Sequence, residues 1–177
     1  MRILGERNDV IAIILQAAEK HRVPADVALA FAWCESKFVA TAEGDLNWAV
    51  RDGGKRYERN VLRQKRLTYN PARCEPEAWH SYGLFQLLAC YHVGEREHPS
   101  ALLDPERNAE IGCKFIRSLL NRTGGDPEAA RLLFVGLPLE GASTEGDRAK
   151  VLGNLRAARA RFAGYAPQQT PHDGGAS

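Results

Sequence analysis

Apolar residues recur at helical spacing in six segments of the chain, and polar or glycine-rich stretches separate these segments. Several segments open with a capping aspartate, asparagine, serine or threonine, and in two of them a proline follows directly. A helix is expected in each, over about residues 9–20, 23–38, 83–91, 104–124, 126–134 and 144–162. No repeat and no convincing sheet pattern is present. The sequence therefore predicts a mainly α fold, with room for a small β-hairpin in the irregular middle of the chain.

The segment from Val23 to Phe38 contains an almost unbroken apolar run. Val27 to Cys34 contains no polar residue, so this helix is expected to be buried, and Glu35 follows directly. Burial of an ionised carboxylate is costly and favours the protonated form, which can donate a proton as a general acid. A glutamate that turns outward at the helix end would give the same sequence, so this helix alone leaves both interpretations open.

Between residues 39 and 80 the periodicity is lost, and the middle of this segment is strongly basic. A short helix over about 57–65 is possible there. The segment is either a solvated surface flap or a positively charged rim that attracts an anionic polymer. Its basic residues are Arg51, Lys55, Arg56, Arg59, Arg63, Lys65, Arg66 and Arg73.

The composition favours one globular domain. Of the 177 residues 44% are hydrophobic and 26% charged, and the net charge is only +2, which argues against a nucleic-acid partner. We expect a domain over 1–165 with an insertion over about 46–79, and a disordered tail over 166–177. No apolar run reaches the length of a membrane helix, and the first residues do not resemble a signal peptide.

The four cysteines are widely spaced, and the five histidines are scattered. Neither CxxC nor HExxH occurs, so we expect reduced core cysteines and neither a metal site nor a cofactor.

Gln86 is the one fully polar residue in the apolar run that follows Ser81. Ser81 can cap a helix that starts near Gly83, and Gly83 permits close approach of the backbone to a neighbour or ligand. Because a buried amide requires partners, Gln86 either ties the core together or offers its amide to a ligand.

Three stretches, VPADVALAFAWCESKF, SYGLFQLL and LLDPERNAEIGCKFIRSLL, resemble in order the catalytic domain of soluble lytic transglycosylases and goose-type lysozymes. The family pattern is a buried helix that ends in Glu-Ser-x-Phe, then Gly-Leu-x-Gln, then a helix that starts with Asp-Pro-x-x-Asn. The resemblance covers about residues 9–162 except the middle segment. It implies a lysozyme-like fold.

The resemblance also implies cleavage of the β-1,4 bond between N-acetylmuramic acid and N-acetylglucosamine in peptidoglycan. Glu35 would protonate the glycosidic oxygen and then act as base on the C6 hydroxyl, which closes a 1,6-anhydro ring. The substrate would lie beside a group of neighbouring residues, with Gln86 bonding an N-acetyl group. This group is Ser81, Tyr82, Gly83, Phe85 and Gln86.

Two family residues are replaced. Leu133 stands where members usually carry a tyrosine beside the acid, and Tyr165 or Tyr82 could supply the missing hydroxyl. Gly44 stands where members carry a serine nine places after the glutamate.

The middle segment is longer than in the compact family pattern, and it could carry a second carboxylate. Asp45 or Asp52 could then activate water, and the enzyme would be an inverting muramidase.

Two other classes of function stay open: a wall-binding or structural module that has lost catalysis, and a helical DNA-binding domain that uses the basic segment. Without a signal peptide, a wall-degrading enzyme needs another route to the periplasm or cell wall. Association with a phage particle or with secretion-machine proteins is therefore expected.

Overall fold

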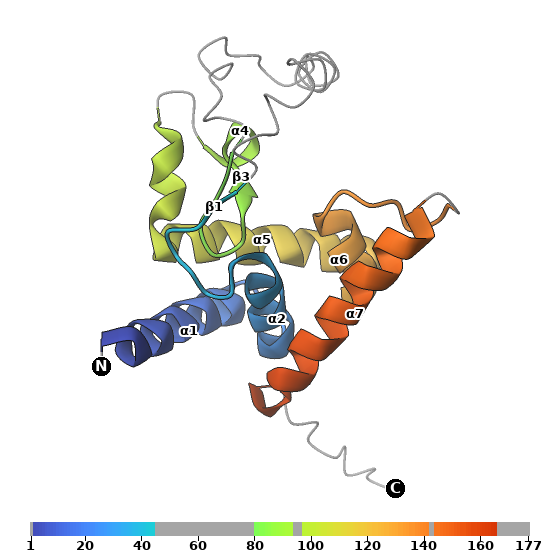
Figure 1. Cartoon of the computed structure of the whole chain (residues 1–177), viewed down its shortest axis with the longest axis horizontal. Coiled ribbons are helices and arrows are strands. Elements are labelled where there is room, and N and C mark those ends of the chain that lie inside the picture. Colours follow the sequence, from blue (N-terminus) through green and yellow to red (C-terminus); the bar gives the residue numbers. More distant parts are fainter. Residues whose placement is uncertain (1, 45–79, 94–96, 142–143, 166–177) are drawn as a thin grey trace, which may run out of the picture.

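The computed structural model describes residues 2–44, 80–93, 97–141 and 144–165. Helices make up most of this part of the chain (Figure 1), which confirms the mainly α prediction. The helices are α1 (Arg2–Lys20), α2 (Ala25–Ser36), α4 (Ala89–His92), α5 (Pro105–Arg122), α6 (Pro127–Phe134) and α7 (Glu145–Arg161), with 3-10 turns η3 (Pro99–Leu103) and η5 (Ala163–Tyr165). Within the described residues, no helix combines the length and apolar character that crossing a bilayer requires.

The two Asp-Pro signals begin α5 and α6 as predicted. Oδ1 of Asp104 accepts a hydrogen bond from the N–H of Arg107 at 2.7 Å, and Oδ1 of Asp126 accepts one from Glu128 at 2.8 Å. The proline that follows each aspartate lies in the first turn, where no N–H is needed.

The predicted start of the first helix is wrong, because α1 already begins at Arg2 rather than at Asn8 or Asp9. Residues 2–7 are mostly good helix formers, so the helix extends through them. The predicted short helix over 57–65, the insertion over 46–79 and the tail over 166–177 lie outside the described residues.

A small antiparallel sheet stands where the sequence predicted a helix from Gly83. Its strands β1 (Glu43–Gly44), β2 (Ser81–Tyr82) and β3 (Leu87–Leu88) are ordered β1-β2-β3. Glu43 lies opposite Tyr82, and Ser81 lies opposite Leu88. The predicted hairpin therefore exists, although its two paired strands β2 and β3 follow the irregular segment.

The helix prediction fails here because of backbone geometry. Gly83 has φ +74° and Gln86 has φ +46°, whereas a right-handed helix requires negative φ. The chain reverses between these residues, and the helix α4 begins only at Ala89. Ser81 is accordingly a strand residue and caps no helix.

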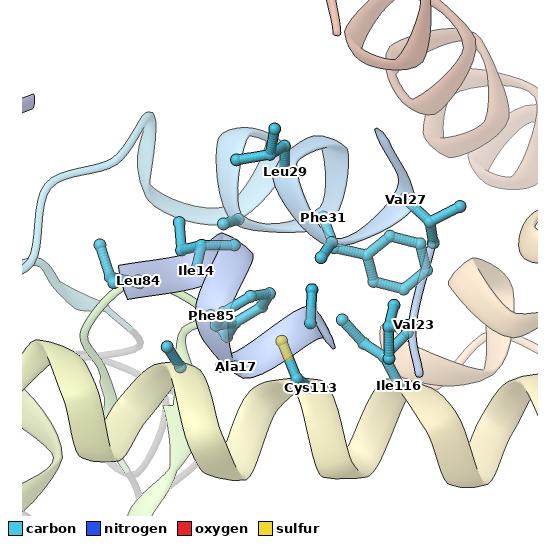
Figure 2. Packing of buried hydrophobic residues seen from close by; sticks show 14 of the residues in the cluster. Ile14, Ala17, Val23, Val27, Leu29, Phe31, Leu84, Phe85, Cys113 and Ile116 are labelled. Carbon is cyan, nitrogen blue, oxygen red and sulfur yellow. The ribbon is translucent and has the colours of Figure 1, made fainter. Parts of the chain in front are cut away.

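The core lies between α1, α2 and α5, and α7 covers the other side of α2 (Figure 1). Phe85, at the tip of the hairpin, is fully buried among core side chains that include Cys113 (Figure 2). A Cβ on Gly112 would lie only 2.5 Å from the Phe85 ring. The hairpin is thus anchored by an aromatic plug that fits against a glycine of α5.

Candidate active site

A cleft of about 720 Å³ opens between the hairpin, the end of α2, and α6. Most of its wall is apolar, with one carboxylate, one amide and one imidazole among its lining side chains. These residues are Glu35, Gly44, Ser81, Gln86, Leu87, Leu88, Tyr91, His92, Phe115, Leu133, Phe134, Val135 and Gly136.

Glu35 lies in the last turn of α2, and its side chain is 17% exposed. Its Oε1 is 2.5 Å from Nη1 of Arg131, whose side chain is 7% exposed. The two side chains form an ion pair, although Nη1 is not aligned for a hydrogen bond. Their attraction is still strong, because the Coulomb energy depends on the distance between the charges. The carboxylate is therefore less isolated than the apolar helix predicted.

Arg131 is a site residue that the sequence analysis missed. Its guanidinium lies 5.3 Å from the ring centre of Phe31 and 5.5 Å from that of Phe134, so two aromatic faces support the cation. The signal was present in the sequence, because Arg131 is the only charged residue in the run from Ala129 to Val135. A lone charge inside an apolar run requires a partner, as it did for Gln86.

Gln86 ties the core together, as one of its two interpretations predicted, and it also lines the cleft. Its Nε2 donates to the carbonyl oxygens of Ala42 at 3.1 Å and Gly83 at 3.0 Å, which ties β1 to the hairpin. Its side chain also lines the cleft, and Oε1 faces Gly44. A ligand N–H can donate to this oxygen.

Asn108 and Ser36 hold the hairpin against the helices. Oδ1 of Asn108 accepts from the N–H of Phe85 at 2.9 Å, while Nδ2 donates to the carbonyl oxygens of Tyr82 at 2.8 Å and Leu102 at 2.9 Å. Oγ of Ser36 lies 2.9 Å from the carbonyl oxygen of Leu84 and donates to it. Because Ser36 follows Glu35 directly, this bond fixes the carboxylate relative to Gln86.

Of the predicted substrate-binding residues, the structure brings Ser81 and Gln86 to the cleft with Glu35. Tyr82, Gly83 and Phe85 do not line it. Phe85 is a core residue, Tyr82 is 4% exposed, and Gly83 packs so closely that a Cβ would lie 2.4 Å from Nδ2 of Asn108. Phe85 and Gly83 pack against α5 at Gly112 and Asn108, away from the cleft. Asp45 and Asp52 lie outside the described residues.

Neither tyrosine suggested as a replacement for the one missing at Leu133 reaches the cleft. Tyr82 is buried, and Tyr165 is exposed in η5 at the end of the last helix. Tyr91, which the sequence analysis placed only on a helix, does line the cleft. The position of Leu133 itself is as the resemblance implies, because its side chain lines the cleft together with Glu35.

Gly44 is coupled to Gln86. A Cβ at residue 44 would lie 2.2 Å from Oε1 of Gln86, so the family serine cannot stand here while Gln86 keeps its present position. The replacement of the family serine by Gly44 therefore makes room for Gln86 in its anchored position.

His92 also lines the cleft, from α4 and beside Tyr91. Burial lowers the pKa of His92 below its ordinary value of 6.5, and its ring lies 5.7 Å from that of Phe115. His92 is thus expected to be neutral near pH 7 and to present a hydrogen-bonding imidazole on a mostly apolar wall.

Among the described residues, no three side chains of histidine, cysteine, aspartate or glutamate are grouped so as to hold a metal ion. Cys34 and Cys113 are free thiols. Burial raises the pKa of Cys113 to about 12 and also raises the pKa of Cys34, so both are poor nucleophiles.

A family model described as the transglycosylase SLT domain matches residues 12–134. The chain belongs to this family. The matched part of this SLT domain runs from α1 to the end of α6 and so contains Glu35, the hairpin, Asn108 and Arg131. The family supports a peptidoglycan-degrading function of the lytic transglycosylase type. No curated protein and no solved structure matched the chain.

Proposed function

We propose that this SLT domain is a lytic transglycosylase that cleaves the β-1,4 bond between N-acetylmuramic acid and N-acetylglucosamine with Glu35 as its one catalytic carboxylate. The observation that carries the proposal is that Glu35 is the only carboxylate among the described residues that line the cleft. The family match adds the substrate class.

In the first step the protonated carboxyl of Glu35 donates its proton to the glycosidic oxygen, and the bond from that oxygen to C1 of the muramic sugar breaks. In the second step the carboxylate takes the proton of the C6 hydroxyl while the C6 oxygen bonds to C1. The product is a 1,6-anhydro ring, and Glu35 ends in its starting protonation state. No water is consumed.

Arg131 supports this cycle through the carboxylate that the first step creates. A permanent cation 2.5 Å from Oε1 stabilises that anion and holds it in place for the second step.

Gln86 and Ser81 are the proposed substrate-binding residues of the hairpin. Since Nε2 of Gln86 already serves two backbone carbonyls, its Oε1 is the atom offered to the substrate, and an N-acetyl N–H is the matching donor. The apolar faces of Leu87, Phe115 and Phe134 provide contact area for the sugar rings.

An inverting muramidase is the alternative that a specific observation favours. Inversion requires a second carboxylate about 6.5–9.5 Å from the acid, and Asp45 directly follows the cleft residue Gly44. Asp52 is a candidate on sequence grounds alone. A binding module without activity is less well supported, because binding does not require a carboxylate paired with a buried arginine.

The proposed place of action is the cell wall or periplasm. Association with phage or secretion-machine proteins stays a prediction of the sequence.

The test is mass spectrometry of the sugars released from purified peptidoglycan. The wild type is expected to release anhydromuramyl products, and Glu35→Gln is expected to lower the rate about 10²–10⁴-fold, because the amide cannot donate the proton. Glu19→Gln removes an exposed carboxylate of α1 outside the cleft and serves as the matched control.

Reducing muramyl ends from the wild type would instead support hydrolysis and direct attention to Asp45 and Asp52. Activity that survives in Glu35→Gln would overturn the assignment of the acid, and no release from several wall types would favour the binding module.

A further inference from the structure

A second pocket, of about 370 Å³, lies between α2, α6 and α7. Arg131 lines it while also pairing with Glu35 of the cleft. We call it the cationic pocket. Its lining residues are Trp33, Cys34, Lys37, Arg131, Val151, Asn154, Ala157, Ala158 and Arg161.

All the charged residues that line the cationic pocket are positively charged. Lys37, Arg131 and Arg161 line it, and no carboxylate is among the lining residues. Two of the cations contact Trp33. Nζ of Lys37 donates to the carbonyl oxygen of Trp33 at 2.9 Å, and the guanidinium of Arg161 lies 4.4 Å from the centre of the Trp33 ring. Cations that are held together without an acidic partner in the same pocket favour an anionic ligand.

Arg131 provides an independent indication. Its side chain is more than nine-tenths buried, and its Nε has no hydrogen-bond acceptor among the described residues, whereas Nη1 faces the carboxylate of Glu35. Buried charged donors in native proteins are normally satisfied by an acceptor. An oxygen ligand in the cationic pocket would supply one.

We infer that the cationic pocket binds a carboxylate of the peptide that peptidoglycan carries on its muramic acid. Guanidinium groups match the geometry of a carboxylate, and Asn154 adds an amide donor to the same wall. The choice of this ligand rests on the proposed function, whereas the preference for an anion rests on the pocket alone.

The position of the pocket favours a carboxylate that arrives with the substrate. Cys34 and Glu35 are consecutive on α2, and one lines the pocket while the other lines the cleft. On α6, Arg131 lines the cationic pocket and Leu133 lines the cleft. A peptide attached to the sugar in the cleft is therefore held near the pocket, which raises its effective concentration there.

The test is calorimetric titration of the full chain with the free stem peptide, which contains no sugar, and with the same peptide amidated at its carboxyl groups. The wild type is expected to bind the free peptide and not the amidated one. Lys37→Gln and Arg161→Gln are each expected to weaken binding about tenfold through loss of one charged contact. Lys150→Gln removes an exposed cation from α7 outside the pocket and is the matched control.

Equal loss in Lys150→Gln, equal binding of the amidated peptide, or no saturable binding would each overturn the inference. Tighter binding of inorganic phosphate than of the peptide would replace the carboxylate by a phosphate ligand. Because the peptide has no glycosidic bond, a negative result leaves the proposed cleavage by Glu35 untouched. Loss of cleavage in Glu35→Gln likewise does not affect the binding result.

Discussion

Two walls of the cleft are held in place by different kinds of interaction. The hairpin wall, residues 81–88, is fixed by neutral hydrogen bonds from Asn108 and Ser36 and by the buried ring of Phe85. The α6 wall, residues 131–136, meets α2 through the ion pair of Arg131 with Glu35. In the first wall the side-chain donors and acceptor of Asn108 all have partners, whereas in the second wall Nε of the buried guanidinium has no acceptor among the described residues.

The two walls should respond differently when a proton moves in the cleft. Hydrogen bonds between amides and carbonyls do not change as a proton moves, so the hairpin wall keeps Gln86 in one place throughout the proposed reaction. The ion pair changes strength whenever Glu35 gains or loses its proton. We therefore expect variants of the hairpin wall to act mainly on stability, and variants of the α6 wall to act on stability and activity together.

The largest stability effect is expected for Asn108→Ala. The variant removes three buried hydrogen bonds, to the N–H of Phe85 and to the carbonyl oxygens of Tyr82 and Leu102. The free energy of unfolding should fall by about 3–5 kcal/mol, measured by urea denaturation. Asn121→Ala, on an exposed position of the same helix, should cost less than about 0.5 kcal/mol. Similar losses in both would mean that the hairpin wall does not depend on this side chain.

The ion pair is tested by a double-mutant cycle of Arg131→Met and Glu35→Gln. Arg131→Met alone should lower the free energy of unfolding by about 2–4 kcal/mol, because it leaves a partly buried carboxylate without its counter-charge. The same change should cost clearly less in the Glu35→Gln background. Thermal and urea unfolding of the four proteins give the coupling energy, and a coupling near zero would refute the role assigned to Arg131.

Gly44→Ser restores the family serine and tests whether the hairpin wall tolerates it. The new Cβ would displace Oε1 of Gln86, whose Nε2 is held by two carbonyls, so a stability loss of about 1 kcal/mol is expected. Cleavage should slow, because Gln86 moves from its place in the cleft. Gly146→Ser, with open space around its Cβ, is the control for a glycine replacement. Unchanged activity would show that the position of Gln86 does not matter for cleavage.

The smallest effect is expected for His92, which lines the same cleft from α4. Burial lowers its pKa in the folded state, so between that lowered pKa and about 6.5 the unfolded chain binds a proton that the folded chain does not. The free energy of unfolding should therefore fall as the pH drops below about 6.5. His92→Gln should flatten this part of the stability curve, measured by urea denaturation between pH 7.5 and 5. An unchanged slope would mean that other groups cause it.

The sequence was most informative where local chemistry decides the structure. Asp104 and Asp126 begin their helices because an aspartate caps and a proline starts a helix whatever lies around it. The buried character of α2 likewise followed from its unbroken apolar run. The same run drew attention to Glu35, and the resemblance to the transglycosylase family then selected it as the candidate acid.

The sequence misled where a local pattern had more than one structural solution. The mostly apolar run Leu84 to Leu88 can bury its side chains either as a helix or as a hairpin with a buried tip. Hydrogen bonds from Asn108, which is distant in the chain, stabilise the hairpin. Tyr82 and Phe85 were expected beside the substrate because of the family resemblance, but both side chains are buried in the core. Glu35 was expected to be isolated because its partner lies 96 residues further along the chain.

The sequence by itself predicted most of the helices and the burial of α2, because these depend on residue type and spacing over a few turns, and it singled out Glu35 as a candidate acid. Only the tertiary structure decided that Arg131 pairs with Glu35, that Gln86 is tied to Ala42 and Gly83, and that three cations share a pocket. These relations join distant segments through distances of a few ångströms. Periodicity along the chain carries no information about which charge on one helix meets which group on another.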